Sequence, residues 1–410
     1  MYIVLPLVLC KLYIVLFVIF HFSLLTFHFS LYMRILLLGD YSNVHWTLSE
    51  GLRALGHEVC VVSDGDGWKN YRRDVDLCRR SLGKMDTLRY LFDILRAMPK
   101  FRNYDVVQLI NPVFFDLRAD KIKPFYHFIR RHNKHLVLGS FGMDHYWVKT
   151  CLDCTTFRYS DFNIGSHQRT EEPFNQEFIR DWLDGEKAPI NQFVAADADA
   201  IVTGLYEYDC CYRPHFPDKT HFIPFPINCS TVTPKLPRSE GAPIRFFVGI
   251  QRSRHAYKGT DIMLHALERV KALHPHACDI VKVENVPFDE YQQLMSSSDV
   301  ILDQLYSYTP AMNALLAMAK GLIVVGGGEE ENYEILHENE LRPIINVLPD
   351  EEDCFQKMEQ LVLHPERVPE LSRQSVEYIH RHHDHIKVAK QYESLYQQLT
   401  NGARAEGKLA

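Results

Sequence analysis

From Met33 onward, short runs of aliphatic and β-branched residues alternate with longer amphipathic stretches. Arg34–Leu38 and Glu58–Val62 are two such runs, and between them Leu48 and Leu52 recur at helical spacing. Strands of a parallel sheet are buried on both faces and therefore read as continuous apolar runs. The alternation predicts an α/β protein whose parallel strands are covered by helices on both faces. With 46% hydrophobic residues, the composition excludes disorder, collagen and a coiled coil.

The chain carries two such series, which predict two doubly wound, Rossmann-like domains in tandem. Prolines cluster between Pro214 and Pro243, as in a semi-rigid connection. We predict a first domain over residues 33–228, a second over 229–385, and a C-terminal helix over 386–410 that packs back on the first domain.

Ligands of doubly wound sheets bind beyond the carboxyl ends of the strands. Gly39 ends the first strand of the first domain, and Gly249 ends the first strand of the second. We therefore predict that the two domains face each other across a central cleft that both glycines border.

Residues 1–32 are almost wholly apolar, with Lys11 as their only Lys or Arg. The run is long enough to cross a bilayer, which favours a membrane segment. No small-residue cleavage site follows it, and a complete first strand begins right after Met33, which favours a spurious leader upstream of the true start. Both interpretations stay open.

Charge and cysteine content restrict the partners and the compartment. Lys and Arg total 45 against 52 Asp and Glu, a formal charge of -7, so no overall basic field exists to hold nucleic acid. The ten cysteines show no recurring framework, which indicates reduced thiols and a cytoplasmic protein.

A basic loop follows the first strand of the second domain. Between Gly249 and Gly259 it carries three fixed cations, Arg252, Arg254 and Lys258. Arg supplies planar paired donors and Lys a compact charge, so such a loop can clamp a diphosphate without a metal. A solvated basic loop is the alternative.

A second candidate anion site begins the helix that follows Ser307. Thr309 suits the N-cap position and Pro310 the first helical position. The free backbone N–H groups of Ala311, Met312 and Asn313 would then attract phosphate together with the helix dipole. A merely structural helix start would show the same residues.

Several motifs together resemble the retaining family-four glycosyltransferases of the GT-B fold. The donor-domain resemblance rests on the dipeptides Val248-Gly249 and Lys258-Gly259 and on the segments Asp299–Gln304 and Ala317–Val325. The acceptor-domain resemblance rests on Gly39–Ser42, Gly51–Val59 and Ala198–Val202. It covers nearly everything after Met33.

The resemblance implies a hexosyl transfer from a nucleotide-diphosphate sugar, a UDP- or GDP-sugar, to an acceptor in glycan or glycolipid assembly. It also implies retention at the anomeric carbon and no metal or other cofactor. Arg252 and Lys258 have the six-residue spacing of the family's diphosphate-binding pair, and Arg254 competes with Arg252 for that role.

The sequence departs from the family at its paired glutamates. Tyr308 and Leu316 occupy those positions, and a leucine cannot accept a hydrogen bond from a ribose hydroxyl. Asn313 and the run Glu329–Glu331 could supply the missing contacts, although an acidic run is usually a solvated helix start. The alternatives to a transferase are a degenerate binding or scaffold protein, and a nucleotide-sugar epimerase or hydrolase.

In the first domain, Phe141 stands where the family places a histidine. Asp144 matches the family's Asp, and either Asp144 or the adjacent His145 could contact a sugar hydroxyl or manage a proton. His45, in the loop after the first strand, is expected to face the cleft. A surface turn is the alternative for both histidines.

A basic aromatic stretch, Lys121–Arg131, could touch anionic lipid and so suit a lipid-linked acceptor. An ordinary amphipathic cover helix explains the same pattern. The predicted partners are therefore a nucleotide sugar, a glycan or lipid-linked acceptor and a peripheral membrane contact, while the oligomeric state stays open.

Overall fold

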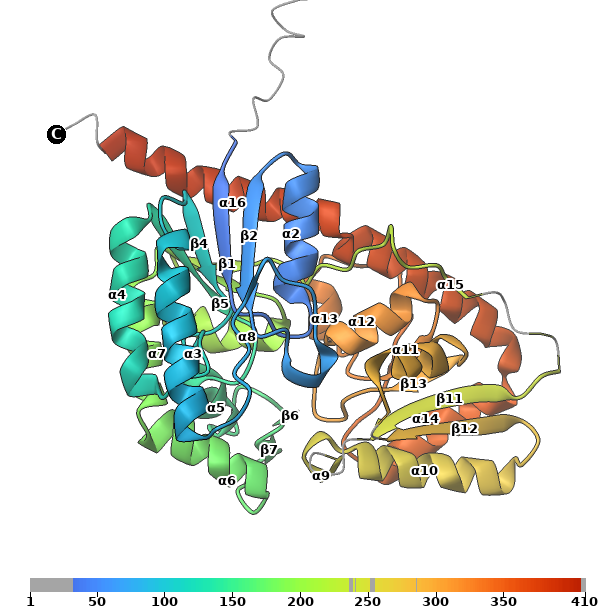
Figure 1. The fold of residues 1–410 in the computed structure, drawn as a ribbon. Helices are drawn as coiled ribbons and strands as arrows, with labels where there is room; N and C mark the ends of the chain where they lie inside the picture. Colours follow the sequence, from blue (N-terminus) through green and yellow to red (C-terminus); the bar gives the residue numbers. More distant parts are fainter. Residues whose placement is uncertain (1–31, 236–238, 240, 251–254, 285, 407–410) are drawn as a thin grey trace, which may run out of the picture. The chain divides into compact units, whose positions relative to one another are not determined.

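Two parallel β-sheets organise the chain (Figure 1). The computed structural model describes residues 32–235, 239, 241–250, 255–284 and 286–406. The strands of the first sheet are β1 (Arg34–Leu38), β2 (Glu58–Ser63), β3 (Val75–Asp76), β4 (Val106–Leu109), β5 (His135–Ser140), β9 (Ala200–Thr203) and β10 (Thr220–Phe222). Those of the second are β11 (Ile244–Ile250), β12 (Cys278–Glu284), β13 (Val300–Leu302), β14 (Ile323–Gly326) and β15 (Ile345–Asn346).

The seven strands of the first sheet run in the order β10-β9-β5-β4-β1-β2-β3, and the five of the second in the order β12-β11-β13-β14-β15. All neighbours in both sheets pair in parallel. We call the first sheet with its helices the first lobe, and the second sheet with its helices the second lobe. The predicted α/β class with two tandem Rossmann-like sheets is confirmed.

Helices connect the strands and cover the sheets. In the first lobe these are α2 (Val44–Ala54), α3 (Lys84–Ala97), α4 (Ile122–His132), α5 (His145–Cys151), α6 (Pro173–Ile179), α7 (Lys187–Asp197) and α8 (Tyr206–Tyr212). In the second they are α9 (His255–Lys258), α10 (Thr260–Leu273), α11 (Phe288–Ser296), α12 (Met312–Ala319), α13 (Glu330–Ile335), α14 (Glu351–Leu363) and α15 (Val368–Tyr378), and α16 (His385–Glu406) ends the described chain. Short turns of other helix types are η1 (Gly67–Lys69), η2 (Met98–Lys100), η3 (Ala119–Lys121), η4 (Arg180–Asp184), η5 (Pro365–Arg367) and η6 (Ile379–His383).

Alternate residues of each strand supply the two faces of a sheet. In β1, Ile35 and Leu37 join a core that includes residues of α2 and α16, whereas Leu36 and Leu38 join a second core under α3, α4 and α7. All four side chains are fully buried. The apolar run at 34–38 is therefore continuous because both of its faces are covered.

A small antiparallel sheet was not predicted. It consists of β6 (Tyr159–Ser160), β7 (Asn163–Ile164) and β8 (His167–Gln168), which lie between α5 and α6 of the first lobe. Strands of two residues carry no periodicity that a sequence could reveal. The segment around them makes many of the contacts between the lobes described below.

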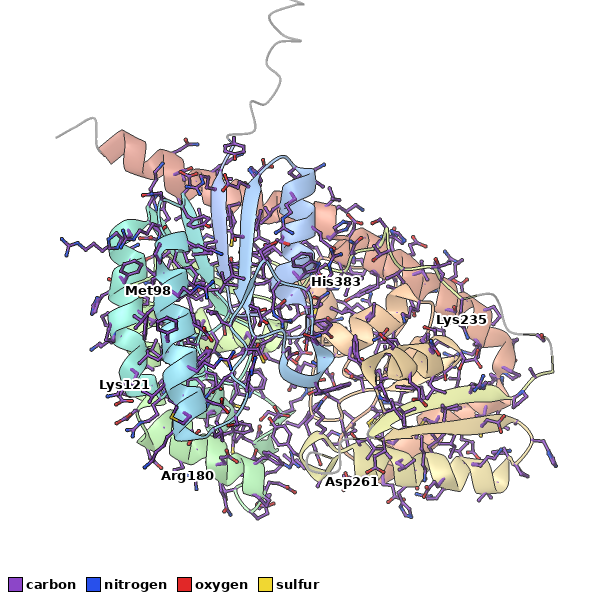
Figure 2. The ribbon with its side chains drawn as sticks, in the orientation of Figure 1. Met98, Lys121, Arg180, Lys235, Asp261 and His383 are labelled. Carbon is purple, nitrogen blue, oxygen red and sulfur yellow. The ribbon has the colours of Figure 1, made fainter. Side chains whose placement is uncertain are left out.

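The C-terminal helix α16 packs against α2 (Figure 1). Tyr396 of α16 donates a hydrogen bond to Gln108 Oε1 at 2.7 Å, and Gln108 Nε2 lies 3.2 Å from His45 Nε2. His383, marked in Figure 2 just before this helix, is buried and bonds the carbonyl of Phe225 through Nδ1. The domain boundaries predicted at residues 228 and 385 stay predictions.

Residues 1–31, the subject of the predicted leader or membrane segment, lie outside the described residues. Within the described part of the chain, no helix has both the length and the apolar composition needed to cross a bilayer. The nine cysteines between 60 and 354 are all free thiols.

Gly51→Ala should weaken the packing of α16 on α2. A Cβ at Gly51 would lie 2.3 Å from the carbonyl oxygen of His385 and 2.7 Å from Cβ of Ala389. Overpacking of this kind costs about 1–3 kcal/mol, and we expect urea unfolding to show that loss. Gly402→Ala, in the same helix α16 with open space around it, should not destabilise the protein. Equal stability of the two variants would contradict this packing.

Candidate functional site

The carboxyl edge of the second sheet brings together a cation, a carboxylate and an amide. Lys258 ends α9, Asp303 follows β13, and Asn313 lies in the first turn of α12. Burial raises the pKa of Asp303, while the Lys258 ammonium, the Gln304 amide and the Asn313 side chain oppose that rise. Lys258, Asp303 and Asn313, which come from three separate motifs of the sequence, thus lie at one edge of the sheet.

Tyr291 of α11 closes this edge against Gly249. The Tyr291 hydroxyl accepts a hydrogen bond from Asn313 Nδ2 at 3.1 Å. A Cβ at Gly249 would lie 2.9 Å from that hydroxyl oxygen, so only glycine fits the end of β11 without displacing the ring. Gly249 is therefore a place of close approach between β11 and α11, which the sequence did not indicate.

Helix α12 begins two residues later than predicted. Its N-cap is Ala311, not Thr309, and Pro310 lies in the preceding loop instead of at the first helical position. The N–H groups of Met312, Asn313 and Ala314 occupy the first turn of α12, where no intrahelical acceptor exists. The positive end of the helix dipole thus lies at Met312 and Asn313, and the Asn313 side chain acts on Asp303, as the Lys258 ammonium does.

Thr309 has a different partner from the predicted phosphate. Glu207 of α8, in the first lobe, accepts hydrogen bonds from the backbone N–H of Tyr308 at 2.7 Å and of Thr309 at 3.0 Å. It also accepts one from the Thr309 hydroxyl at 2.5 Å. The Glu207 side chain is buried, and burial raises its pKa. The backbone N–H groups that precede α12 therefore already have an acceptor, the Glu207 carboxylate of the protein itself.

Arg252 and Arg254, the two predicted diphosphate-binding arginines, lie outside the described residues. Lys258 is held from the other lobe through its neighbour Tyr257, whose hydroxyl donates a hydrogen bond to Asp161 Oδ2 at 2.8 Å. Arg169, also of the first lobe, bonds the Ala256 carbonyl at 3.3 Å. The position of Lys258 thus depends on the segment around β6–β8.

Tyr308, at the first of the two glutamate positions, is part of the contact between lobes. Its hydroxyl accepts a hydrogen bond from the Arg158 backbone N–H at 2.7 Å, and the Arg158 guanidinium lies 4.8 Å from its ring centroid. The Tyr206 ring stacks on it at 5.9 Å. Leu316, at the second position, packs partly buried against the core. Neither position offers a carboxylate.

The run Glu329–Glu331 starts helix α13, and of its three glutamates only Glu330 is exposed, whereas Glu329 and Glu331 are engaged with the first lobe. Glu329, the N-cap of α13, accepts hydrogen bonds from Arg158 Nη2 at 2.8 Å and from Asn346 Nδ2 at 2.9 Å. It also accepts a hydrogen bond from the Tyr159 hydroxyl. Glu331 also pairs with Arg158. The backbone N–H of Glu329 donates to the Tyr308 carbonyl at 3.1 Å, which brings Glu329 next to Tyr308.

At the edge of the first sheet, Asp40 caps helix α2, a role the sequence reasoning missed. Its carboxylate oxygens accept the backbone N–H groups of His45 at 3.0 Å and Trp46 at 3.2 Å. Burial, with Asp64 and Asp66 nearby, raises the Asp40 pKa to about 7. An aspartate directly after a strand-ending glycine and before a helix is a signal that could have shown it.

His45 is buried and does not face the cleft as expected. Its Nδ1–H donates to the Gly39 carbonyl at 2.7 Å, and Nε2 accepts from Gln108 at 3.2 Å, a tautomer assigned from these partners. Burial lowers its pKa to about 3, which keeps the ring neutral. Gly39 has φ +78° and a Cβ there would meet Ile110 at 2.2 Å, so this turn requires glycine.

Asp144 and His145 are engaged inside the first lobe. Asp144 is the N-cap of α5, accepting the Trp147 N–H at 2.9 Å and the Tyr212 hydroxyl at 2.7 Å, and burial raises its pKa to about 6. His145 bonds the Trp182 carbonyl through Nδ1 at 2.9 Å and Gln192 through Nε2 at 3.0 Å. Burial lowers its pKa. His145 therefore does not lie in a surface turn, which is the alternative interpretation of this residue.

Aromatic rings connect the two edges. Trp68 and Tyr71, in the loop after β2, lie 5.7 Å and 5.4 Å from the ring of Phe288 at the start of α11. Phe288 stacks at 6.5 Å on Tyr291, which bonds Asn313. This aromatic chain brings the carboxyl edge of the first lobe up to that of the second, and no motif in the sequence indicated it.

No protein-family profile and no curated protein matches the sequence. Among solved structures, the sucrose-phosphate synthase of Thermosynechococcus elongatus has a TM-score of 0.60 at 12% identity, covering 90% of this chain and 100% of that one. Anabaena HepE in complex with UDP-glucose has a TM-score of 0.55 at 12% identity, over 89% of this chain and 100% of its own.

The UDP-GlcNAc 2-epimerase of Neisseria meningitidis, bound to UDP-GlcNAc, has a TM-score of 0.50 at 11% identity, covering 89% of this chain and 100% of that one. At such identities the likeness establishes the fold. The chain has the GT-B fold of two Rossmann-like domains, which glycosyltransferases share with this epimerase.

Loss of the Glu207 carboxylate should strongly destabilise the protein. Glu207→Ala leaves two buried N–H groups and a hydroxyl without an acceptor, at a cost of about 2–4 kcal/mol. Thr309→Val removes one bond only and should cost about 1 kcal/mol. Chemical denaturation measures both, with Glu334→Ala, an exposed glutamate of α13, as control. A Glu207→Ala protein as stable as the control would refute the contact.

Asp40 should make stability fall between pH 5 and pH 8. Its folded-state pKa of about 7 exceeds the ordinary value of 3.8, so the folded protein holds this proton more tightly. That contribution is complete below the ordinary pKa and is lost as pH rises through 7. Relative to Asp40→Asn, the wild type should lose on the order of 2 kcal/mol across this range.

Urea unfolding at pH 5 and pH 8 gives the change in the free energy of unfolding with pH for the wild type and for Asp40→Asn. Comparing the two changes removes any destabilisation by the introduced amide that is the same at both pH values. Asp218→Asn, at an exposed carboxylate, should leave the wild-type slope unchanged. Identical slopes for the wild type and Asp40→Asn would show that Asp40 does not titrate in this range.

Proposed function

We propose that the protein is a glycosyltransferase that moves a hexosyl group from a UDP- or GDP-sugar to a glycan or lipid-linked acceptor. The observation that carries the proposal is the edge where Lys258 and Asn313, of the first turn of α12, both act on Asp303 in a GT-B fold. Transfer of a sugar from such a donor leaves a nucleoside diphosphate, whose negative charge grows in the transition state. An ammonium and oriented N–H groups at this edge stabilise that charge.

The proposed step breaks the bond between the anomeric carbon and the diphosphate oxygen and forms one to an acceptor hydroxyl oxygen, with retention at the anomeric carbon. The acceptor proton leaves with the diphosphate. Lys258 and the amides of Met312 and Asn313 hold the leaving group in place of a metal. Arg252 and Arg254 belong to the same loop and are proposed as its further cations.

We assign the remaining predicted residues to positioning. Gly39, through its carbonyl, holds His45, and Gly249 gives room to Tyr291. Asp144 caps α5 and His145 joins α5 to the η4 turn, so both hold the first lobe in shape. Thr309, Pro310 and Ala311 set the start of α12. The free cysteines support a cytoplasmic enzyme.

One observation favours a second candidate, a binding or scaffold protein. The two positions that the resemblance assigns to glutamates hold Tyr308 and Leu316, and Tyr308 is committed to Arg158 of the first lobe. A protein that binds a nucleotide sugar without transferring it would keep Lys258 and α12 and need no further carboxylate. The lobes would then present a fixed surface to a partner.

Lys258→Ala should weaken UDP binding by about 10- to 100-fold, because a charge-assisted hydrogen bond contributes about 1.5–3 kcal/mol. Isothermal titration with UDP and GDP measures the affinity, and chelation by EDTA should not change it. Lys282→Ala removes a lysine of the same lobe that pairs with Glu268 on the surface, and it should bind UDP as the wild type does.

The outcomes separate the candidates. Binding of UDP-glucose with transfer to an acceptor, and an unchanged anomeric configuration by NMR, supports the transferase. Binding without turnover supports the scaffold, and turnover without acceptor supports an epimerase or hydrolase. If neither UDP nor GDP binds at millimolar concentration, the proposal of a nucleotide-sugar donor site at Lys258 is wrong.

A further inference from the structure

Large apolar side chains gather on the outer side of α3 and the turn before it. Five residues there expose half or more of their surface: Leu82 (82%), Met85 (78%), Leu88 (62%), Phe92 (64%) and Leu95 (51%). Among the described residues the exposed large apolar side chains number twelve, so a stretch of fourteen residues holds five of them. Monomeric proteins rarely leave such a contiguous patch uncovered.

The spacing places these residues on one stripe. Met85, Leu88, Phe92 and Leu95 follow one another at intervals of three and four, which keeps them on one face of a helix. The opposite face, through Tyr90 and Ile94, is buried in the first lobe. The stripe therefore takes no part in the packing of the core, which contacts the opposite face of α3.

On α3 itself, the charged residues nearest the stripe are cations. At about 100° per residue, Arg89 and Arg96 lie beside Met85 on one flank, and Lys84 lies on the other. Asp86 and Asp93 come next around the helix and, together with Arg89 and Arg96, line a groove between α3 and residues 73–80. Asp86 is engaged there by the Ser81 hydroxyl. The outward face of α3 is thus apolar in the middle and positive at both sides.

The groove itself is also rich in arginine. It has a volume of about 660 Å³, and its charged lining residues are the cations Arg73, Arg79, Arg80, Arg89, Arg96 and Lys100 and the acids Asp74, Asp76, Asp86 and Asp93, so cations outnumber acids. Within the part of the chain that the structure describes, Arg80, Arg89 and Arg96 have no carboxylate partner. Unpaired arginines next to exposed apolar residues suit phosphate groups that sit beside acyl chains.

We propose that the outer face of α3 docks on an anionic lipid bilayer. Met85, Leu88, Phe92 and Leu95 enter the boundary between headgroups and acyl chains, and Arg89 and Arg96 bind lipid phosphates. The charge pattern selects this occupant over a second copy of the chain. Two α3 helices packed stripe to stripe would bring these cations against one another, which disfavours self-association.

This surface differs from the one that the sequence suggested. In α4, Phe125 and Tyr126 are buried and Arg130 pairs with Asp199, so the basic aromatic stretch behaves as a cover helix. Lys121, labelled at the outer side of the first lobe in Figure 2, is exposed without an apolar stripe beside it. The proposal for α3 stands on its own and does not require that the protein be a transferase.

Co-sedimentation of the full chain with vesicles tests the docking. One set of vesicles holds phosphatidylcholine with phosphatidylglycerol, and the other phosphatidylcholine alone. Leu88→Gln with Phe92→Gln should lower the partition coefficient on anionic vesicles at least about tenfold, since two exposed apolar anchors are lost. Arg89→Gln with Arg96→Gln should lower it on anionic vesicles and remove its dependence on salt.

The matched control is Leu273→Gln with Leu363→Gln, two exposed leucines of the second lobe, which should bind as the wild type does. All variants share residues 1–32, so their differences report α3 alone. Equal binding by the Leu88/Phe92 variant and the control overturns the proposal. So does a wild-type dimer in light scattering that the Leu88/Phe92 variant dissociates, because a second copy would then be the occupant.

Circular dichroism and thermal unfolding check that each variant is folded, since the changed side chains are exposed and take no part in the core. UDP titration of the same variants keeps this test apart from the proposed function. Lost vesicle binding with unchanged UDP affinity concerns the docking surface only, whereas lost UDP binding in Lys258→Ala concerns the donor site only.

Discussion

A carboxylate from one lobe, buried against the backbone of the other, determines the geometry of the candidate site. Glu207 takes the N–H groups of Tyr308 and Thr309 and the hydroxyl of Thr309. Removing a charged group from water is costly unless it is fully hydrogen-bonded, and these three donors meet that demand. The loop before α12 consequently has a fixed direction, and with it the first turn that carries Met312 and Asn313.

This contact also gives a physical reason for the residue at position 308. A tyrosine there receives the Arg158 N–H, lies under the Arg158 guanidinium, and stacks on Tyr206. A glutamate could not provide a ring for these contacts, and it would stand beside Glu207 and Glu329 as a third carboxylate. The tyrosine at position 308 therefore depends on Arg158, which also balances the acids of α13.

The sequence was sufficient for whatever depends on local pattern. Apolar runs and helical spacing predicted the two parallel sheets. Gly39 follows β1 and Gly249 lies one residue before the end of β11, close to the strand ends predicted for them, and the structure adds that a side chain at either would clash. What failed depends on partners far along the chain. Glu207 meets Tyr308 across about a hundred residues, and His45 is buried because Gln108 and Tyr396 complete its hydrogen bonds. No periodicity records such pairings.

The helix start shows the same limit on a smaller scale. Thr309 and Pro310 have the residue types of a helix start, yet the helix begins at Met312. Thr309 instead donates its hydroxyl to the Glu207 carboxylate, and a hydrogen bond to a carboxylate is charge-assisted. As an N-cap, the same hydroxyl would accept a neutral hydrogen bond from a backbone N–H of the helix. Because the threonine is held outside the helix, the first free N–H groups shift from the loop to Met312 and Asn313. The N–H groups that Glu207 takes are thus those of Tyr308 and Thr309, and Asn313 in the first turn of α12 acts on Asp303, as Lys258 does.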